Sequence, residues 1–272
     1  RNGDCMIRDI TIGQYYKADS VIHRLDPRVK LMGTLIFIIS LFMGMNIWIY
    51  AVVTVALAVV IKMSRIPLKF MVRGLKSIVI LIIISAVFNL FLTPGDVLIQ
   101  IWKLTITYQG LKMAIFMVVR LIYLIVGTSL MTLTTTPNNL TDGLEKGLGF
   151  LKVIKVPVHE IAMMMSIALR FIPILIEETD KIMKAQMARG ADFENGSLIK
   201  RAKAMVPILV PLFVSAFRRA NELAMAMEAR CYHGSEGRTK MKPLKYEKRD
   251  RIAYISMVLY LGVIIIVKII AA

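Results

Sequence analysis

The sequence LMGTLIFIISLFMGMNIWIYAVVTVALAVVI, residues 31–61, contains no charged side chain. One helix of this length would overshoot a bilayer, which needs about 20 apolar residues, whereas two helices would each be short. The segments on both sides are basic, with Arg28 and Lys30 before the run and Lys62 and Arg65 after it. Basic segments beside membrane spans stay in the cytoplasm, so the run is expected to cross the membrane twice.

The residues Gly44-Met45-Asn46 are the natural turn inside this run, because Gly and Asn favour turns. A single crossing and a re-entrant first helix stay open as alternatives. Asp26-Pro27 is expected to start the first helix, with Asp26 as its N-cap and Pro27 as its first helical residue.

Three more apolar runs predict further spans. Residues 77–93 form a third span that Thr93-Pro94-Gly95-Asp96 ends, residues 110–136 form a fourth, and residues 252–267 form a fifth. Arg120 lies inside the fourth span near its outer end. An ionisable residue at membrane depth is a functional candidate, but snorkelling of its side chain to the interface is expected here at least equally. The predicted fold class is an all-α integral membrane protein with about five transmembrane helices.

The chain has a formal charge of +17 although 57% of its residues are hydrophobic. These two properties are compatible because the basic residues lie mostly between the apolar runs, as in the cytoplasmic loops of a polytopic protein. Few aromatic residues are interleaved with them, so the charge does not indicate a nucleic-acid partner. We expect a multi-pass protein in the lipid bilayer of the plasma membrane, with a cytoplasmic N-terminus.

Residues 137–250 differ from the spans, because apolar and charged residues alternate there at helical spacing and no stretch is expected to cross the membrane. Helices are expected over about 138–150, 158–189 and 197–232, in a cytoplasmic domain. Three prolines inside the two long helices are expected to kink them: Pro173, Pro207 and Pro211.

The predicted domain organisation follows from these runs. Residues 1–136 hold the N-terminal segment and transmembrane helices 1–4, residues 137–250 form the cytoplasmic helical domain, and residues 251–272 form the C-terminal transmembrane helix.

The two long helices of residues 137–250 end alike. One ends in Lys184-Ala185-Gln186-Met187-Ala188-Arg189-Gly190, and the other ends in Met225-Ala226-Met227-Glu228-Ala229-Arg230-Cys231. In both, alanines stand one and four residues before an arginine, so that small side chains share one helix face. An arginine there complements the helix dipole, and its five donors can also reach a partner. The repetition at two helix ends favours two docking tips.

With these tips the chain, from Met6 onward, resembles the transmembrane (T) components of energy-coupling factor transporters. Its stretch His23-Arg24-Leu25-Asp26-Pro27-Arg28-Val29-Lys30, preceded by Gly13-Gln14-Tyr15 and Asp19-Ser20, looks like the entry motif of that family. Ala188-Arg189-Gly190 is similar to the family's paired Ala-Arg-Gly signature, and Ala229-Arg230-Cys231 departs from it only at the third position.

The resemblance implies a non-catalytic coupling subunit in a bacterial cell membrane. The docking residues Ala188, Arg189, Gly190, Ala229, Arg230 and Cys231 would fit into grooves on two ABC-type ATPases. Another face would hold a separate substrate-binding membrane subunit, the S component. ATP would be bound by the ATPases, whose closure would move the helices and reorient the S component for vitamin uptake. No cofactor, catalytic residue or metal ligand is expected in this chain.

The third residue of each tip predicts a difference between the tips. Gly190 can adopt the left-handed conformation that ends a helix at no steric cost, whereas Cys231 cannot. The second long helix is therefore expected to continue to about Gly234, with Arg230 inside its last turn and Arg189 at the very end of its own helix. Each tip would then suit a different groove, which favours two distinct ATPase subunits.

Methionine is frequent in this chain, with 19 residues. Its unbranched side chain repacks easily, which suits a surface that accepts several partners, although it also fills gaps in cores. Residues expected to contact the S component are Met163, Met164, Met165, Met183 and Met205. The chain's length and the long segment after the fourth span resemble T components shared among several S components. A T component dedicated to one metal or vitamin S component is the alternative.

A polytopic membrane enzyme is a lower alternative. The acid clusters are Glu177-Glu178-Asp180 and Asp192-Glu194, and the first is expected only to solvate its helix face. The sequence has no Walker A loop, glycine-rich phosphate loop or nucleophile–base pair. A stand-alone channel would need polar groups within its spans, and the first three spans have almost none.

Overall fold

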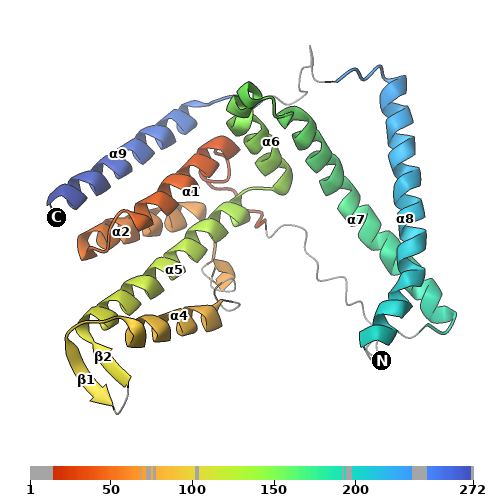
Figure 1. The fold of residues 1–272 in the computed structure, drawn as a ribbon. Coiled ribbons are helices and arrows are strands. Elements are labelled where there is room, and N and C mark those ends of the chain that lie inside the picture. Colours follow the sequence, from red (N-terminus) through yellow and green to blue (C-terminus); the bar gives the residue numbers. More distant parts are fainter. Residues whose placement is uncertain are drawn as a thin grey trace. The chain divides into compact units, whose positions relative to one another are not determined.

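The computed structural model describes residues 15–67, 69–71, 75, 78–101, 104–191, 193, 198–234 and 244–270. These residues fall into two compact units, which we call the first unit (residues 13–143 and 244–272) and the second unit (residues 144–243). Figure 1 shows that helices make up most of both units.

The first unit contains most of the predicted spans. Its elements are α1 (Pro27–Phe42), α2 (Ile47–Ser64), α4 (Val79–Leu92), β1 (Val97–Ile101), β2 (Leu104–Thr107), α5 (Tyr108–Thr134), the first part of α6 (Pro137–Gly147), and α9 (Lys248–Ile270). The second unit contains the end of α6, the 3₁₀ helix η1 (Leu148–Ile154), α7 (Val158–Ala188) and α8 (Leu198–Ala229).

The uncharged run 31–61 forms two helices, as its turn residues predict. α1 ends at Phe42, and α2 starts after Asn46, whose side chain accepts a hydrogen bond from the Trp48 backbone N–H at 3.3 Å. The start of α1 is also confirmed, because Asp26 accepts from the Arg28 backbone N–H at 2.9 Å and Pro27 is the first helical residue. A single straight helix through this run is therefore wrong.

Among the described residues, four helices are long and apolar enough to cross a membrane, by length and composition: α2, α5, α7 and α9. Three of them coincide with predicted spans, and α4 is a shorter apolar helix. The expectation that no stretch of residues 137–250 is apolar enough to span is wrong for α7. Its first 18 residues carry only Glu160 and Arg170 as charged residues, because its other charges gather in its second half.

The segment between α4 and α5, which is expected from the sequence to be a loop, forms a β-hairpin. Strands β1 and β2 pair antiparallel, with Ile99 opposite Ile106 and Ile101 opposite Leu104. The Tyr108 backbone N–H donates to the Asp96 carbonyl at 2.9 Å, next to the start of α5. Branched aliphatic residues and threonines favour strands, a local preference that charge counting along the chain does not detect.

One core cluster of the first unit lies where α1, α2, α5 and α9 meet. Its buried side chains are Leu41, Ile49, Tyr50, Val53 and Ile264. α5 comes very close to α1 at Gly127, because a Cβ atom added there would lie 2.4 Å from the Phe37 ring. α4 packs along α5 on the other side of α5, and the hairpin joins these two helices (Figure 1).

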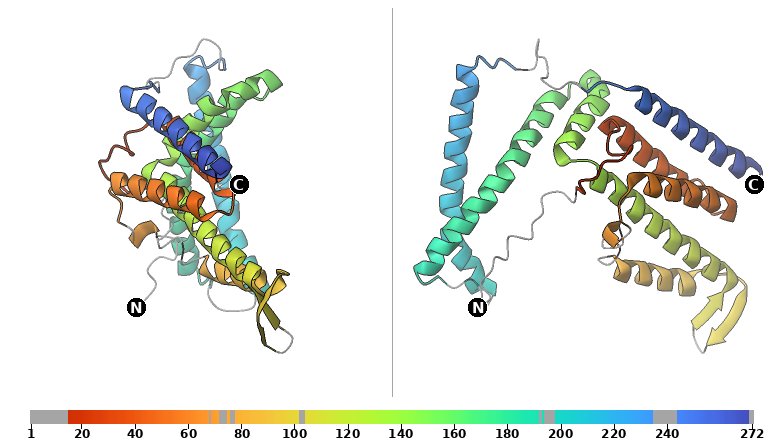
Figure 2. Two further views of the ribbon diagram at one scale, coloured as in Figure 1. Left: turned by 90° about the vertical axis from the view of Figure 1, so that its left-hand side faces the viewer. Right: turned by 180° about the vertical axis from the view of Figure 1, so that it is seen from behind.

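The second unit is dominated by two long helices that pack against each other in antiparallel directions. α7 has 31 residues and α8 has 32 residues, and both continue through their internal prolines. Figures 1 and 2 show them crossing, with the C-terminal end of α7 and the C-terminal end of α8 at opposite ends of the pair. This arrangement places the two Ala-Arg sequences far apart along the pair.

Candidate functional site

The end of α7 is a Schellman cap with Arg189 as its C-cap residue. Gly190 takes a left-handed conformation with φ of 87°. The Gly190 backbone N–H donates to the Met187 carbonyl at 2.9 Å, and the Ala191 N–H donates to the Gln186 carbonyl at 3.0 Å. These two bonds satisfy carbonyl groups that a helix end otherwise leaves without partners.

The end of α8 has the same geometry. Cys231 takes the left-handed conformation with φ of 55°, although it is not glycine. Its N–H donates to the Glu228 carbonyl at 2.9 Å, and the Tyr232 N–H donates to the Met227 carbonyl at 3.1 Å. The prediction that this helix continues to Gly234 is therefore wrong. Because the two cap hydrogen bonds form, they outweigh the cost of roughly 1–2 kcal/mol for a left-handed non-glycine residue.

Arg189 and Arg230 consequently occupy equivalent positions. Each directly follows the last helical residue, Ala188 or Ala229, and each side chain is exposed. Within the described residues, neither guanidinium has an ion-pair or hydrogen-bond partner. The predicted difference between a terminal tip and an internal tip is absent, so helix-end geometry gives no reason for two distinct docking partners.

A polar cluster joins α7 to α8 where they cross. Glu178 accepts a hydrogen bond from Ser215 Oγ at 2.5 Å through one carboxylate oxygen, and from Arg219 Nη2 at 3.0 Å through the other. The acid cluster at residues 177–180 was expected only to solvate its helix face, and that expectation is wrong for Glu178. An antiparallel pairing of residues some 40 positions apart leaves no local sequence signal.

Gln186 makes a second polar contact between these helices. Its Nε2 donates to the Pro207 carbonyl at 3.3 Å. In a regular helix this carbonyl would accept from the residue four positions later, which is Pro211 and has no N–H. The proline therefore frees an acceptor in α8, and a side chain of α7 uses it.

The methionines predicted to contact an S component are distributed over both long helices. Met164, Met165 and Met205 are exposed, and Met164 has 58% of its surface accessible. Met163 and Met183 are half-buried. The structure therefore leaves most of this set available to a partner.

A larger apolar surface on α8 was not identified from the sequence. We call it the α8 stripe, and it consists of Val210, Phe213, Val214, Phe217, Asn221 and Met225. Its members recur at spacings of three and four residues, a signal that was present in the sequence. Phe213 and Phe217 are 61% and 67% exposed, and their stacked rings lie 6.5 Å apart between centroids.

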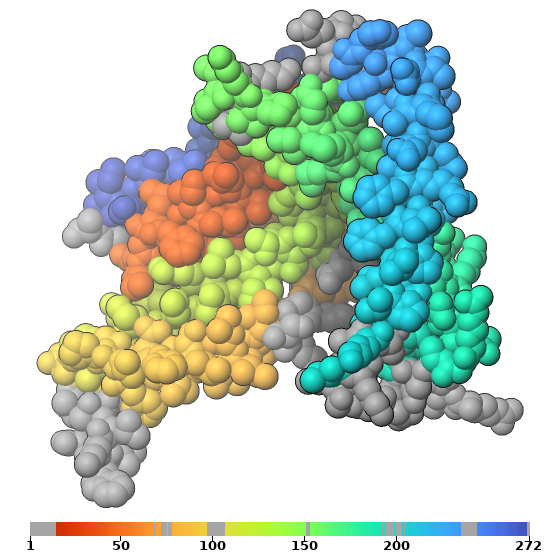
Figure 3. All heavy atoms as spheres, turned by 45° about the vertical axis from the view of Figure 1, so that its right-hand side comes forward, coloured from red at the N-terminus to blue at the C-terminus, as the bar shows by residue number. Residues whose placement is uncertain are grey.

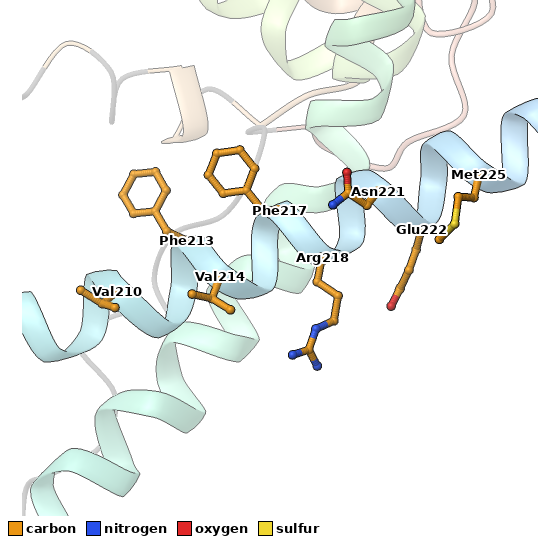
Figure 4. Close-up of a pocket in the computed structure, with 8 residues that line it drawn as sticks. All are labelled: Val210, Phe213, Val214, Phe217, Arg218, Asn221, Glu222 and Met225. Atoms are coloured by element: carbon orange, nitrogen blue, oxygen red, sulfur yellow. The ribbon is translucent and has the colours of Figure 1, made fainter.

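The two phenylalanine rings of the α8 stripe lie together on one side of the helix. In Figure 4 the rings of Phe213 and Phe217 lie on one side of α8, whereas the charged side chains of Arg218 and Glu222 point to the other side. Figure 3 shows the side chains of α8 standing at the surface along most of the helix. α7 leaves this apolar face of α8 exposed, and an apolar face of this kind on a long helix needs a further partner.

Arg120 does not snorkel, and this expectation is wrong. The residue is only 9% exposed, in the core of the first unit. Its Nε donates to the Tyr50 hydroxyl at 3.0 Å, and its guanidinium lies 5.1 Å from the centroid of the Phe42 ring. The side chain thus joins α5 to α1 and α2 through a hydrogen bond and a cation–π contact.

Asp250 is a buried carboxylate, 2% exposed, that caps two helices at once. One oxygen accepts from the Glu247 N–H at 2.8 Å at the start of α9, and the other accepts from the Asp26 N–H at 2.9 Å at the start of α1. Nearby, Lys30 Nζ donates to the carbonyls of His23 and Thr134 at 3.1 and 2.9 Å. The entry motif is thereby tied to the C-terminal helix.

Two histidines illustrate how the polar residues are used structurally. His159 Nδ1 and Glu145 Oε1 lie 2.8 Å apart between α7 and the end of α6. Burial lowers the pKa of His23, so its ring is neutral near neutral pH. Among the residues that the structure describes, no group of three or more His, Cys, Asp or Glu side chains gathers into a metal site.

Comparisons with known proteins agree with the resemblance in the sequence. The family model "CbiQ: Cobalt transport protein" matches residues 18–241. The energy-coupling factor transporter transmembrane protein EcfT of Clostridium kluyveri is 57% identical over 250 residues, covering 91% of this chain and 93% of its own. The EcfT proteins of Thermosediminibacter oceani and Bacillus subtilis are 56% and 47% identical, with 92% and 93% of this chain covered and 94% and 96% of their own. The chain belongs to the family of transmembrane components of energy-coupling factor transporters.

Proposed function

We propose that this chain is the coupling subunit of a vitamin or micronutrient importer and performs no catalysis itself. Two ABC-type ATPases bind its arginine tips, and an S component binds the apolar surface of its second unit. The observation that carries the proposal is the pair of matching helix caps, each presenting an exposed arginine, Arg189 or Arg230. Closure of the ATPases on ATP moves both helix ends and so reorients the S component.

The helix caps suit this task because they fix the start of each arginine side chain. In each Schellman cap the last turn is closed by two backbone hydrogen bonds, so the arginine leaves a rigid helix end. The guanidinium then offers up to five N–H donors to acceptors in a partner groove. ATP is bound by the partner subunits. The tips lie in the cytoplasm, as does the N-terminus, because the segments that flank the apolar runs are basic.

The S component is proposed to contact the α8 stripe and the methionines of α7 and α8. The stripe offers mainly aromatic and aliphatic surface, with Arg218 and Glu222 at its margin, which fits the apolar transmembrane helices of another membrane subunit. The predicted contact residues Met164, Met165 and Met205 add exposed, easily repacked side chains. Such a surface suits a T component that several S components share.

The arginine tips are tested by alanine substitution in the assembled complex. Truncating an arginine that makes charge-assisted bonds across an interface costs about 2–5 kcal/mol. Arg189→Ala and Arg230→Ala should each weaken ATPase binding or uncouple ATP hydrolysis from uptake, and the double variant should abolish transport. Arg170→Ala, which removes an exposed arginine from the middle of α7, is the control and should behave like the wild type.

Mass spectrometry of the gently solubilised complex measures the outcome directly. The wild type should retain two ATPase chains and an S component. A double tip variant that still retains both ATPases and transports normally would refute the proposal. Two copies of one ATPase in the wild-type complex would show that the two ATPases are identical, and two different chains would show that they are distinct.

The S-component surface is tested separately. Phe213→Ser with Phe217→Ser should release the S component while both ATPases stay bound, because these side chains lie on the stripe and not at a tip. Replacing Met163, Met164 and Met165 by Leu keeps the apolar volume but lowers adaptability, and should impair different S components to different degrees. Uniform effects, or none, would favour a dedicated subunit whose methionines only fill gaps.

A further inference from the structure

Glu178 and Arg219 occupy corresponding places on their helices. Glu178 lies eleven residues before the tip residue Arg189, and Arg219 lies eleven residues before the tip residue Arg230. At 1.5 Å per residue, each tip is about 16 Å along its helix from the ion pair. The two residues that correspond in the repeat are thus the two that contact each other.

This coincidence has a geometric meaning. In two antiparallel helices with a common repeat, corresponding residues meet only where a local twofold axis passes between the helices. The Glu178–Arg219 contact marks that point. The helix pair is therefore divided into matching arms, and the two tips lie at equal distances on either side of the crossing.

The contact is suited to fixing the crossing point. Glu178 uses both oxygens, one toward Ser215 and the other toward Arg219, so it holds two successive turns of α8. A shift of α8 by one residue would rotate these donors by about 100° around the helix and break both bonds. In contrast, apolar contacts between the helices tolerate a change of register. Ile208 is the single buried apolar residue of α8 among its described positions, so few such contacts oppose a shift.

We propose that the Glu178–Arg219 ion pair is the pivot that sets the crossing of α7 and α8 and keeps the two arginine tips equidistant from it. The pivot is a positioning element: it contacts neither ATPase nor substrate, but it determines where both tips stand when two ATPases close together. This inference rests on the proposed function for its effect on transport, and on geometry alone for its effect on the tip-to-tip distance.

The test uses the complete complex with its ATPases and S component. Spin labels are attached at Lys184→Cys and Glu228→Cys, two exposed positions near the tips, with Cys5 and Cys231 replaced by Ser. Pulsed electron paramagnetic resonance gives the distribution of distances between the labels, and the number of ATP molecules hydrolysed per substrate gives the coupling. The variants are Glu178→Gln, Arg219→Gln, and the exchange Glu178→Arg with Arg219→Glu.

The single variants should broaden the distribution of tip-to-tip distances or shift it by several ångströms. They should also raise the number of ATP molecules hydrolysed per substrate several-fold. The exchange should restore both quantities toward the wild type. Glu177→Gln is the matched control, because it removes the same charge one residue away, at an exposed position, and it should change neither quantity.

Two results would overturn the pivot. One is an unchanged distance distribution and unchanged coupling in both single variants. The other is an exchange variant that keeps its ATPases but restores neither quantity. A failure of the proposed function looks different: the distance would respond to Glu178→Gln, while Arg189→Ala and Arg230→Ala would leave ATPase binding and transport intact.

Discussion

Single residues with left-handed backbone conformations decide how the two long helices α7 and α8 end. Gly190 and Cys231 hold the same place in their caps, with φ of 87° and 55°. A left-handed conformation costs a non-glycine residue roughly 1–2 kcal/mol, and glycine almost nothing. The cap of α8 therefore carries a strain that the cap of α7 lacks, even though their hydrogen bonds match.

Gly190→Ala should loosen the last turn of α7, and Cys231→Gly should leave the last turn of α8 as stable as before or slightly more stable. No atom outside the local chain lies within 4 Å of the position where a Gly190 Cβ would be built, so the whole penalty is backbone strain. Hydrogen exchange at the Ala191 and Tyr232 amides measures both caps. Gly190→Ala should also reduce ATPase assembly more than Cys231→Gly does. Equal exchange rates in the two variants would contradict this account.

The hydrogen bond between the buried Arg120 and Tyr50 is expected to stabilise the first unit. Tyr50→Phe removes the hydroxyl that accepts from Arg120, and a hydrogen bond to a charged group contributes about 1.5–3 kcal/mol. The thermal stability of the purified complex should fall accordingly, while uptake per assembled complex stays within a few-fold of the wild type. Tyr123→Phe is the control, because the Tyr123 hydroxyl bonds to Thr54 Oγ1, a neutral partner.

The control should lose only about 0.5–1.5 kcal/mol. If the two Tyr→Phe variants lose equal stability, the charge of Arg120 is irrelevant to the contact. If Arg120→Gln abolishes transport in a normally assembled complex, the residue has a role in the transport path that its burial does not suggest.

Among the elements, α1 and α9 are joined by one carboxylate. Asp250→Asn keeps the shape of the side chain but leaves only one acceptor oxygen for the Asp26 and Glu247 N–H groups. One buried donor then has no partner, which costs roughly 1–3 kcal/mol. We expect faster hydrogen exchange at the start of α1 and a lower unfolding temperature. Glu247→Gln, which breaks only an exposed ion pair with Arg249, should have an effect of about 0–1 kcal/mol. Equal effects would contradict the double cap.

The elements also show what a sequence can and cannot predict. Features encoded within a few residues can be predicted: the Asp26-Pro27 start of α1, the break before Asn46, and the end of α7 at Arg189-Gly190. The pairing of β1 with β2 does not follow from the distribution of charge along the chain, because its signal is strand propensity. The end of α8 was misjudged because the cost of one left-handed cysteine was weighed without the two hydrogen bonds that offset it.

Contacts between distant residues had no local signal at all. Asp250 lies 224 positions from Asp26, and Arg219 lies 41 positions from Glu178. Each of these residues looked like an ordinary charge on a helix. The roles of these residues are visible only in the folded chain, where Asp250 caps α1 and α9 and Arg219 joins α8 to α7.

The membrane topology of the whole molecule depends on whether α7 crosses the bilayer. α7 is apolar enough to span a membrane by length and composition, yet its second half carries Glu177, Glu178, Asp180, Lys181 and Lys184. Placing these charges at membrane depth would be costly. α8 is not among the helices apolar enough to return across the bilayer. If α7 crossed, α8 and its tip would therefore lie outside the cell, out of reach of cytoplasmic ATPases.

Cysteine labelling in intact cells separates these topologies, since Cys231 is exposed at the α8 tip and serves as a native reporter. With Cys5 replaced by Ser, an impermeant reagent should label Cys231 only after the cells are permeabilised. In a background without Cys231, Ile99→Cys should be labelled from outside. Lys69→Cys should be protected, because position 69 lies in the basic segment after residues 31–61 and basic segments stay in the cytoplasm. Labelling of Cys231 in intact cells would make α7 a membrane span and would remove the arginine tips from the cytoplasm. Labelling of position 69 with protection of position 99 would instead invert the first unit and overturn the double crossing by α1 and α2.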